Sequence, residues 1–384
     1  MQKRIAIINQ RYGGEVNGGS EYYTKQLAEH LNEVYDVEVL TTTALDYDTW
    51  APYYEAGATI VDGVRVRRFD VDQVRNKAWF KFINKLMVFF PAGQRLLEPV
   101  WQRAQGPYCP ALIEYICSVK DEYDLFIFIT YLYYTTTAGL PKVAEKSLLV
   151  PTAHDEYCVY FPGYKKIFTK PKGIIYLTEE EKMFVERVFR NQDMLHVVAG
   201  TGIEISSKLK QRASQDFYLI YVGRVDTSKK CDVLFRYFSN YKDRYPGPLK
   251  LVVVGKEMME VPVHNDIIYK GFIGEEEKHH LIANAIALVM PSEHESLSLS
   301  VLESMALGVP VIVNGNCPVL RAHCQISGAG LWYFDDNEFD QCVEQMVKGD
   351  EIYENRKRLA LEYIEQNYSW KKTVNDFRRM IDCD

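Results

Sequence analysis

Arg4-Ile-Ala-Ile-Ile-Asn9 and Phe217-Tyr-Leu-Ile-Tyr-Val-Gly-Arg224 are short apolar runs that each lead into a glycine-bearing loop. After the first run, apolar side chains recur at helical spacing between Ser20 and Asn32, and Val37–Thr42 is the next apolar run. A strand, a helix and a second strand in this order form a βαβ unit, which predicts a parallel sheet. The same order restarts at Phe217, so we expect two α/β domains of similar construction.

Further apolar runs indicate how each half continues. They lie at Leu125–Ile129, Leu148–Pro151, Gly173–Leu177, His196–Val198, Leu249–Gly255, Ile267–Tyr269, Ala287–Met290 and Val309–Val313. We predict a Rossmann-like, doubly wound domain over residues 1–204, a second one over 205–365, and a closing helix over 366–384 that packs back on the first domain. Two such domains leave a cleft between the carboxyl ends of their strands, where open α/β sheets bind ligands.

The composition excludes several classes of protein. A chain of 384 residues with 47% apolar residues can build two cores. The net charge of -7 provides no basic excess, so we expect no nucleic-acid partner. The opening residues lack the apolar run of a signal peptide, and nowhere do about 18 apolar residues run together. The 8 cysteines are scattered, which is typical of reduced thiols, so we expect a cytoplasmic enzyme.

The densest motif is Pro291-Ser-Glu-His-Glu295-Ser-Leu-Ser-Leu-Ser-Val-Leu-Glu303-Ser-Met-Ala-Leu-Gly308-Val-Pro310. Its order predicts a strand end, a serine-rich turn, a short helix, a glycine cap and a proline stop. Glu295 stands before the helix and Glu303 within it, so the two carboxylates can reach opposite ends of one ligand. Free amides at the helix start are a ready site for a diphosphate or a sugar hydroxyl. The candidates there are Ser296, Leu297, Ser298 and Leu299.

This run resembles the Glu-x7-Glu region of the family 4 retaining glycosyltransferases, which have the two-domain GT-B fold. The resemblance implies that Glu295 contacts the donor sugar and that Glu303 holds the ribose hydroxyls of a nucleoside diphosphate sugar. The spacing alone would occur roughly twice by chance in a chain of this length, so the whole run carries the resemblance. The competing interpretation is a capping glutamate followed by a solvated helix glutamate.

A basic loop opens the second half: Gly223-Arg224-Val-Asp-Thr-Ser-Lys229-Lys230-Cys231-Asp232. Arginine and lysine at the end of a first strand can neutralise a leaving diphosphate as its charge grows. The loop resembles the family's Gly-Arg…Lys-Gly element, which implies diphosphate contacts from Gly223, Arg224 and Lys230. The chain departs from this pattern by having Cys231 where glycine is usual, and Lys229 is the competing candidate. A solvated basic turn is the alternative to a phosphate site.

A glycine loop follows the first strand: Gly13-Gly14-Glu-Val-Asn-Gly18-Gly19-Ser20-Glu21. It is similar to the family's N-terminal Gly-Gly loop, which faces the donor phosphate and the acceptor, and Gly18 and Gly19 fit it best. A dinucleotide-binding loop is the other interpretation. However, the next strand ends in Thr41-Thr42-Thr43 rather than in the acidic residue that holds an NAD ribose.

Two further motifs complete the expected site. His154 follows an apolar run and resembles the family's cleft histidine, which implies contact with the sugar or the acceptor; a hydrogen-bonded structural histidine is the alternative. The residues after Lys270 resemble the loop that holds the nucleotide base through backbone groups, and they are Gly271, Phe272 and Ile273.

The region after residue 313 is less informative. Asn314, Gly315 and Asn316 end a strand and are weaker candidates for the site. The run Pro318-Val-Leu-Arg321-Ala-His323-Cys324 departs from the family's Gly-x-Pro-Glu-Val pattern, which we interpret as the mark of a subgroup.

Two acidic triplets are candidates for a metal site: Asp46-Tyr-Asp48 and Asp70-Val-Asp72. Metal-dependent single-domain transferases hold a divalent ion with such a triplet, but short acidic triplets are common in loops. A basic phosphate loop in the second half makes a metal unnecessary. We therefore expect no metal, and no cofactor other than the nucleotide-sugar co-substrate.

Residues 75–103 form a basic aromatic stretch, with Trp79, Phe82 and Phe89 among six basic side chains and one acidic. A basic amphipathic helix with aromatic residues is typical of a peripheral enzyme on the anionic inner face of a membrane. That arrangement suits a lipid-linked acceptor. A helical insertion packed against its own domain is an equally good interpretation.

Together these motifs predict transfer of a hexose from a GDP- or UDP-sugar to a glycan or lipid-linked glycan in cell-surface polysaccharide synthesis, with retention at the anomeric carbon. One alternative is a nucleotide-sugar epimerase of the same architecture, which would need no acceptor. Another is a catalytically silent scaffold of glycan assembly. The retained charges of Arg224, Lys230 and Glu295 argue against a silent protein.

Overall fold

The computed structural model of the chain describes residues 2–16, 18–205 and 217–383. The chain divides into two compact units: Met1–Thr201 together with Lys371–Asp384, and Gly202–Trp370. The first unit ends at Thr201, whereas the sequence placed that boundary after residue 204. Each unit contains its own sheet, as the repeated βαβ order predicts.

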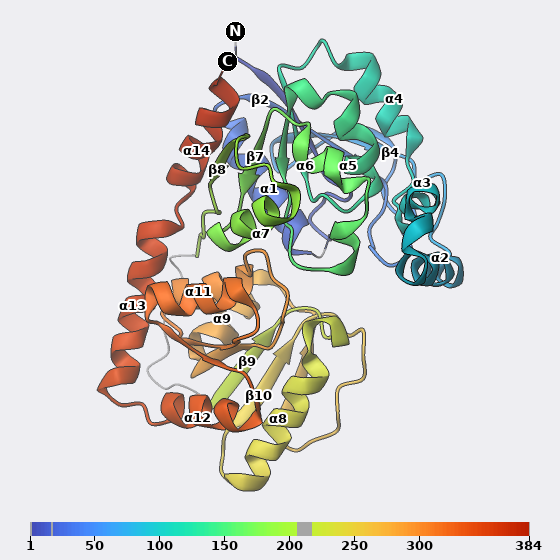
Figure 1. Ribbon diagram of the computed structural model, residues 1–384. Helices are drawn as coiled ribbons and strands as arrows, with labels where there is room; N and C mark the ends of the chain where they lie inside the picture. Colours follow the sequence, from blue (N-terminus) through green and yellow to red (C-terminus); the bar gives the residue numbers. More distant parts are fainter. Residues whose placement is uncertain (1, 17, 206–216, 384) are drawn as a thin grey trace. The chain divides into compact units, whose positions relative to one another are not determined.

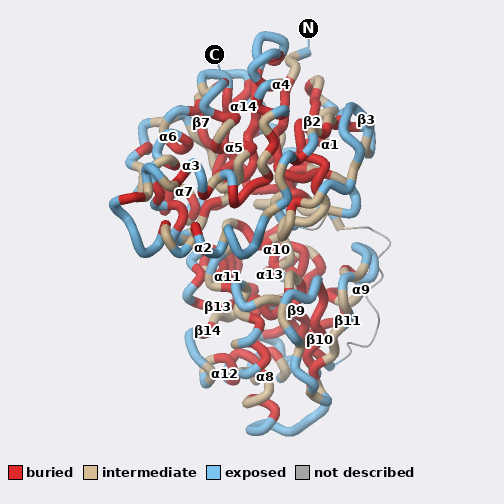
Figure 2. The backbone as a smooth tube through the Cα atoms, turned by 90° about the vertical axis from the view of Figure 1, so that its right-hand side faces the viewer, coloured by how far each residue is buried: buried red, intermediate tan, exposed pale blue. Residues whose placement is uncertain are grey.

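The first unit is built on an eight-stranded sheet in the order β3-β4-β2-β1-β5-β6-β7-β8. All neighbouring strands are parallel except β3 and β4, which form an antiparallel pair at one edge. The central strands are buried apolar runs, as is usual for a parallel sheet covered on both faces, while β3 is exposed (Figure 2). The strands are β1 (Arg4–Ile8), β2 (Asp36–Thr42), β3 (Gly57–Val61), β4 (Val64–Phe69), β5 (Leu125–Ile129), β6 (Ser147–Val150), β7 (Gly173–Tyr176) and β8 (Leu195–Val198).

Helix α1 (Gly19–Asn32) follows β1 and buries Tyr23, Leu27 and Leu31, which confirms the helical spacing read from the sequence. Helices α2 (Lys77–Phe89) and α3 (Gln94–Gln105) lie side by side at the margin of this unit (Figure 1). The remaining helices and 3-10 turns of the unit are η1 (Pro91–Gly93), α4 (Pro110–Val119), α5 (Tyr134–Gly139), η2 (Leu140–Lys142), η3 (Ala144–Lys146), η4 (Tyr157–Tyr160), α6 (Tyr164–Thr169) and α7 (Glu179–Phe189).

The second unit has a six-stranded parallel sheet in the order β11-β10-β9-β12-β13-β14. Numbered within the unit, this is the order 3-2-1-4-5-6 of a Rossmann domain, whose strand order reverses between its first and fourth strands, here β9 and β12. The strands are β9 (Tyr218–Val222), β10 (Lys250–Val254), β11 (Ile267–Gly271), β12 (Ala287–Met290), β13 (Val311–Asn314) and β14 (Gly330–Tyr333). The helices are η5 (Thr227–Lys229), α8 (Cys231–Arg244), α9 (Glu275–Asn284), α10 (Leu299–Ala306), α11 (Pro318–Ser327), α12 (Asp336–Val347) and α13 (Glu351–Asn367).

The last helix, α14 (Trp370–Asp382), packs on the first unit, as its apolar spacing predicts. Phe377 and Met380 are buried there, and the Thr373 hydroxyl donates to the carbonyl of Ala199 at 3.2 Å. At the other end of the helix, Lys3 Nζ donates to the carbonyl of Ile381 at 3.0 Å. The chain therefore returns to its first domain after completing the second.

Candidate active site

The strand order of the second unit fixes where a ligand binds. In doubly wound sheets the crevice lies outside the carboxyl ends of the strands, at the point where the order reverses. Here that point lies between β9 and β12. The segments that leave these two strands are residues 223–230 and 291–298, which are the two motifs that the sequence singled out.

Arg224 is held in place by the loop that carries it. Its Nε forms an ion pair with Asp226, and its Nη2 donates to the Ser228 hydroxyl at 3.1 Å. Asp226 also accepts the backbone N–H of Lys229 at 3.0 Å. Burial alone would raise the pKa of Asp226, but the Ser228 hydrogen bond and the Arg224 charge hold it below its ordinary value. A permanent positive charge is thus oriented before any ligand arrives.

Two ion pairs join the loop after β9 to the loop after β12. Lys229 Nζ lies 2.6 Å from Glu295 Oε1, and Lys230 Nζ lies 2.9 Å from Glu293 Oε2. These pairs bring together the lysines and the first glutamate of the predicted site. Glu293 was not among the predicted site residues, because nothing but its place in the serine-rich run distinguishes it in the sequence.

The residue of this basic loop that has a glycine-like backbone is not Cys231, although the family pattern predicts glycine at position 231. The left-handed residue is Lys230, with φ 60° and ψ 31°, and Cys231 is the buried first residue of α8. A left-handed conformation is the one that favours glycine. In the family's Lys-Gly element the glycine follows the lysine, so the left-handed Lys230 favours Lys229 as the candidate for the lysine of that element.

The turn before α10 is compact and mostly buried. Leu297 and Ser298 are buried, and Ser298 has a left-handed backbone with φ 66° and no capping bond from its side chain. The α-helix begins at Leu299, within the stretch predicted to hold the free amides. The N–H groups of the first turn of a helix have no partner within the helix, so they can meet an anion.

Glu303 is a buried, charged carboxylate rather than a solvated one. Only 5% of it is exposed, and both of its oxygens lie 2.9 Å from Lys278 Nζ on α9. His279 Nε2 is 4.0 Å from Glu303 Oε1. Burial would raise the pKa of Glu303, but His279 and the Lys278 ammonium hold it below its ordinary value. Sequence reasoning missed both partners, because no motif marks the start of α9.

The side chains around Glu303 include residue types that bind metal ions. Single ligand atoms of Glu275, His279 and Glu303 lie within 4.8 Å of one another. However, Lys278 Nζ is 2.7 Å from Glu275 and 2.9 Å from Glu303. The lysine ammonium therefore already occupies the position of a cation between the two carboxylates.

The predicted base loop lies at the end of β11. Gly271 has a left-handed backbone with φ 73°, and its carbonyl accepts the N–H of Gly255 at 2.9 Å. Phe272 is 64% exposed, and Ile273 is partly buried. An exposed aromatic ring at this position can stack on a planar base.

The first unit holds the other predicted residues. Gly18 and Gly19 lie at the start of α1, beside a buried ion pair of 2.5 Å between Arg11 and Glu21. Gly18 has φ 153°, a backbone conformation that favours glycine, and a Cβ there would lie 2.1 Å from the Glu21 carboxylate. His154 follows β6, and its Nε2 lies 3.9 Å from Glu156 Oε1.

The comparison with protein families decides the identity of the chain. Residues 168–360 match the family model described as "Glycosyl transferases group 1". The chain belongs to this family. The matched residues include both loops at the strand reversal point and the buried Glu303.

Individual relatives of this glycosyltransferase are distant. It is 25% identical over 182 residues to a glycosyltransferase of Methanocaldococcus jannaschii, which covers 42% of this chain and 44% of that protein. The chain thus matches less than half the length of that relative.

Two solved structures show the same fold. Sucrose-phosphate synthase from Thermosynechococcus elongatus superposes with a TM-score of 0.71 at 15% identity, over 99% of this chain and 98% of that one. An Anabaena protein in complex with UDP and glucose superposes with a TM-score of 0.69 at 12% identity, over 99% of each chain. The glycosyltransferase therefore has a GT-B fold, as predicted.

The first acidic triplet of this glycosyltransferase has structural partners. Asp46 accepts the N–H groups of Asp48 and Thr49 at 2.9 and 2.7 Å, and Asp48 forms an ion pair with Lys77. Such bonds are typical of a turn. In the second triplet, Asp70 and Asp72 are exposed.

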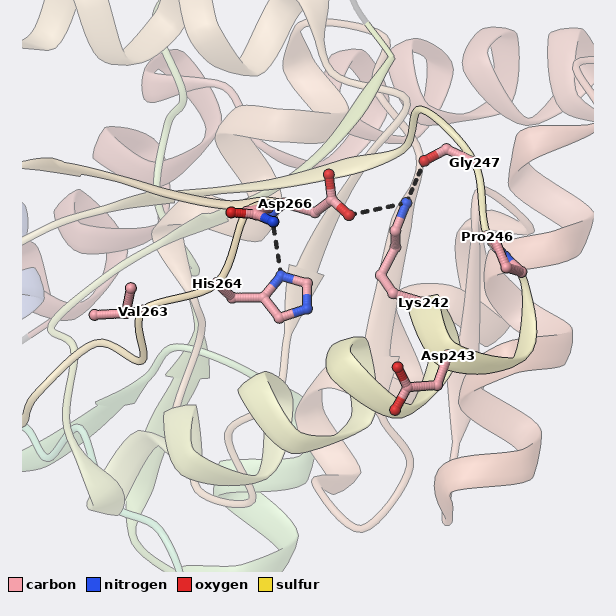
Figure 3. Close-up of a pocket in the computed structure, with 8 residues that line it drawn as sticks. Lys242, Asp243, Pro246, Gly247, Val263, His264 and Asp266 are labelled. Carbon is pink, nitrogen blue, oxygen red and sulfur yellow. Dashed lines mark hydrogen bonds and ion pairs between the residues drawn. The ribbon is translucent and has the colours of Figure 1, made fainter.

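A surface hollow of about 500 Å³ lies elsewhere on the second unit (Figure 3). It borders the amino ends of β10 and β11, and Lys242 in it is held by Asp266 at 3.2 Å and by the carbonyl of Leu249 at 3.0 Å. Because ligands of doubly wound sheets bind at the carboxyl ends, this hollow is not the candidate site.

Lys278→Met should destabilise the glycosyltransferase in a pH-dependent way. The depressed pKa of Glu303 contributes stability above the unfolded pKa of about 4.3, and this contribution is lost as pH falls through the folded value. Without Lys278 the buried carboxylate loses its counter-ion, so we expect a loss of about 3–5 kcal/mol at neutral pH. The loss should shrink near pH 5, because the Glu303 carboxyl can then take up a proton.

Urea unfolding followed by circular dichroism measures this effect, with Lys256→Met at an exposed position as the control. An equal loss at both pH values would show that Lys278 does not neutralise Glu303.

Proposed function

We propose that this chain is a retaining glycosyltransferase that moves a hexose from a GDP- or UDP-sugar to a glycan or lipid-linked glycan in cell-surface polysaccharide synthesis. The observation that carries the proposal is that two ion pairs join the loops after β9 and β12, Lys229 with Glu295 and Lys230 with Glu293. Arg224 is held in the first of these loops by Asp226. The two loops concentrate lysine, arginine and glutamate at the strand reversal point, where a Rossmann domain binds a nucleotide.

Each charged group has a role in the proposal. Arg224 and a lysine hold the diphosphate, Glu295 orients the sugar, and Glu303 holds the ribose. Of the two lysines, Lys229 fits the diphosphate better than Lys230, because Lys229 forms an ion pair with Glu295 and precedes the left-handed Lys230. The amides from Ser296 to Leu299 add donors at the helix start.

The remaining contacts follow the family resemblance. Gly271, Phe272 and Ile273 receive the base, Gly18 and Gly19 face the donor phosphate and the acceptor, and His154 meets the sugar or the acceptor. The Anabaena structure holds UDP and glucose, which supports UDP as the first nucleotide to test.

The proposed reaction proceeds on one face of the sugar. The bond between the anomeric carbon and the donor phosphate breaks, and a bond from the acceptor oxygen forms on the same side. The leaving phosphate takes the proton of the acceptor hydroxyl. As negative charge grows on this phosphate, Arg224 and Lys229 stabilise it more strongly than in the ground state. This chemistry needs no nucleophile from the protein and no metal.

Donor binding must also rearrange the site. Lys229 is held by Glu295 at 2.6 Å, so the diphosphate has to take the lysine from the carboxylate. Glu295 is then released to accept hydrogen bonds from sugar hydroxyls. One exchange of partners would thus prepare both groups for catalysis.

We propose a cytoplasmic location for the enzyme, at the inner face of the plasma membrane when its acceptor is lipid-linked. No helix within the described ranges is both long and apolar enough to cross a bilayer. Residues 75–103 are the segment that we propose for peripheral contact with the membrane.

The test of the donor site is the melting temperature with UDP, GDP, ADP and dTDP, each without added metal. A ligand at about 100 times its Kd stabilises a fold by roughly 2.7 kcal/mol, which is a shift of several degrees. We expect one nucleotide to shift the wild type strongly and Glu303→Ala much less. If none shifts the wild type, the donor site is wrong and a scaffold role is favoured.

Product analysis then separates transfer from epimerisation. With the matching nucleotide sugar, a transferase forms a new glycoside and a free nucleoside diphosphate only when an acceptor is present. An altered sugar formed without any acceptor would contradict the proposal and indicate an epimerase.

The two lysines should respond differently to substitution. Lys229→Met removes a charge-assisted contact worth about 1.5–3 kcal/mol, so the nucleotide identified by melting should bind about ten- to a hundred-fold more weakly. Lys230→Gly relieves a left-handed backbone and should keep nucleotide affinity within about three-fold. Isothermal titration calorimetry measures both, and the reverse ranking would assign the diphosphate to Lys230.

A further inference from the structure

Helices α2 and α3 present an apolar surface that the protein does not cover. On α2 only Ile83 and Met87 are buried, while Trp79, Phe82 and Phe89 are exposed. Phe89 is 80% exposed, and Leu96 on α3 is 83% exposed. We call this surface the hairpin face. Its exposed large apolar side chains are Trp79, Phe82, Val88, Phe89, Phe90, Leu96 and Val100.

The charges on the hairpin face all have one sign. Lys81 and Lys85 on α2 and Arg95 on α3 are exposed. The only acidic residue between positions 76 and 100 is Glu98, which is buried and accepts the N–H of Gly163 at 2.7 Å. The hairpin is therefore apolar and cationic, with no exposed carboxylate of its own between positions 76 and 100.

The hairpin is firmly attached to its unit despite this exposure. Trp101 is buried and donates from Nε1 to Asn84 at 2.8 Å, which joins α3 to α2. Arg75, just before α2, donates to the carbonyls of Tyr47 and Gln105 at 3.0 Å each. The exposed aromatic residues thus belong to a fixed surface of the folded enzyme.

We infer that the hairpin face docks the enzyme on an anionic phospholipid bilayer. The aromatic and aliphatic side chains enter the interfacial layer, while the lysines and the arginine meet the lipid phosphates. The uniform positive charge favours an anionic bilayer as the partner of this face. A second copy of the same face would be repelled, because both carry positive charge. The inference rests on the lipid-linked form of the proposed acceptor and assigns the contact to named side chains.

Sedimentation with vesicles tests the inference. We compare phosphatidylcholine vesicles with vesicles that also contain phosphatidylglycerol, at low and high salt. The wild type should bind the anionic vesicles and be released by salt. Phe89→Ser combined with Leu96→Ser should weaken binding at least about ten-fold, and Lys81→Glu or Lys85→Glu about five-fold each.

Ile60→Ser is the matched control, because Ile60 is also exposed in the first unit, at 71%, but lies outside the hairpin. Its vesicle binding should equal that of the wild type. No binding to anionic vesicles, or equal binding by the hairpin variants, would overturn the inference. So would a wild-type dimer in light scattering that the hairpin variants convert to monomers.

The nucleotide-induced melting shift, measured on the same samples, separates the two proposals. A normal shift without vesicle binding would reject the docking face and leave the donor site standing.

A second, independent inference concerns His323, in the run that departs from the family pattern. His323 is buried on α11, and its Nε2 lies 2.8 Å from the carbonyl of Leu297 in the turn before α10. Its Nδ1 lies 2.9 Å from the hydroxyl of Tyr363. Burial lowers the pKa of His323 to about 4, so the ring is neutral at physiological pH. Because a carbonyl only accepts, Nε2 carries the proton and donates.

The geometry points to His323 as a positioning residue for the donor loop. It fixes the direction of the Leu297 carbonyl and thereby the amides of Ser298 and Leu299 that follow. This role rests on the proposed diphosphate contact of those amides. His323→Leu should weaken binding of the nucleotide identified by melting about five- to ten-fold by calorimetry. His323→Gln, whose amide can still donate, should retain most of the affinity.

Cys324→Ala changes a buried neighbour on α11 whose thiol donates to the carbonyl of Leu331 on β14, and it should leave nucleotide affinity unchanged. If both His323 variants lower the melting temperature equally while nucleotide affinity stays at the wild-type value, His323 is only structural. If none of the four nucleotides shifts the wild type, the donor site itself is wrong.

Discussion

The ion pair between Lys229 and Glu295 is the interaction on which the site depends. It joins the loops that leave β9 and β12, where the strand order reverses and the sheet opens a crevice. Without a ligand, each group neutralises the other, so neither charge is left unpaired in a partly buried place. In the proposed function, a diphosphate replaces the carboxylate as the partner of the lysine.

Local neutralisation by a neighbouring charge also explains why Glu303 can be buried and charged. A fully buried carboxylate is costly unless it is paired, and Lys278 provides the pair from a neighbouring helix. Asp226 does the same for Arg224 within a single loop. The second domain therefore holds its charged groups in fixed pairs, and the reaction proposed for it is an exchange of partners among them.

The sequence was most informative where the pattern is local. Ala287–Met290 was predicted with its observed bounds, because a short apolar run between turns has few other structures to adopt. β4 was missed because charged residues such as Arg65 and Arg67 interrupt its apolar residues. β3 and β14 were also missed, although the residues of both are mostly apolar. Lys278 and His323 were missed as partners because each meets its motif from another helix, at 25 or 26 positions' distance.

The sequence by itself determined the fold class, the family and the chemical character of the two loops, since these depend on short runs of neighbouring residues. Only the tertiary structure decided which charges meet. Lys229 rather than Lys230 faces Glu295 because the left-handed turn at Lys230 directs the two side chains to different glutamates. It also decided that Phe89 and Leu96 face solvent, because a helical pattern gives the period of the apolar residues but not what covers them.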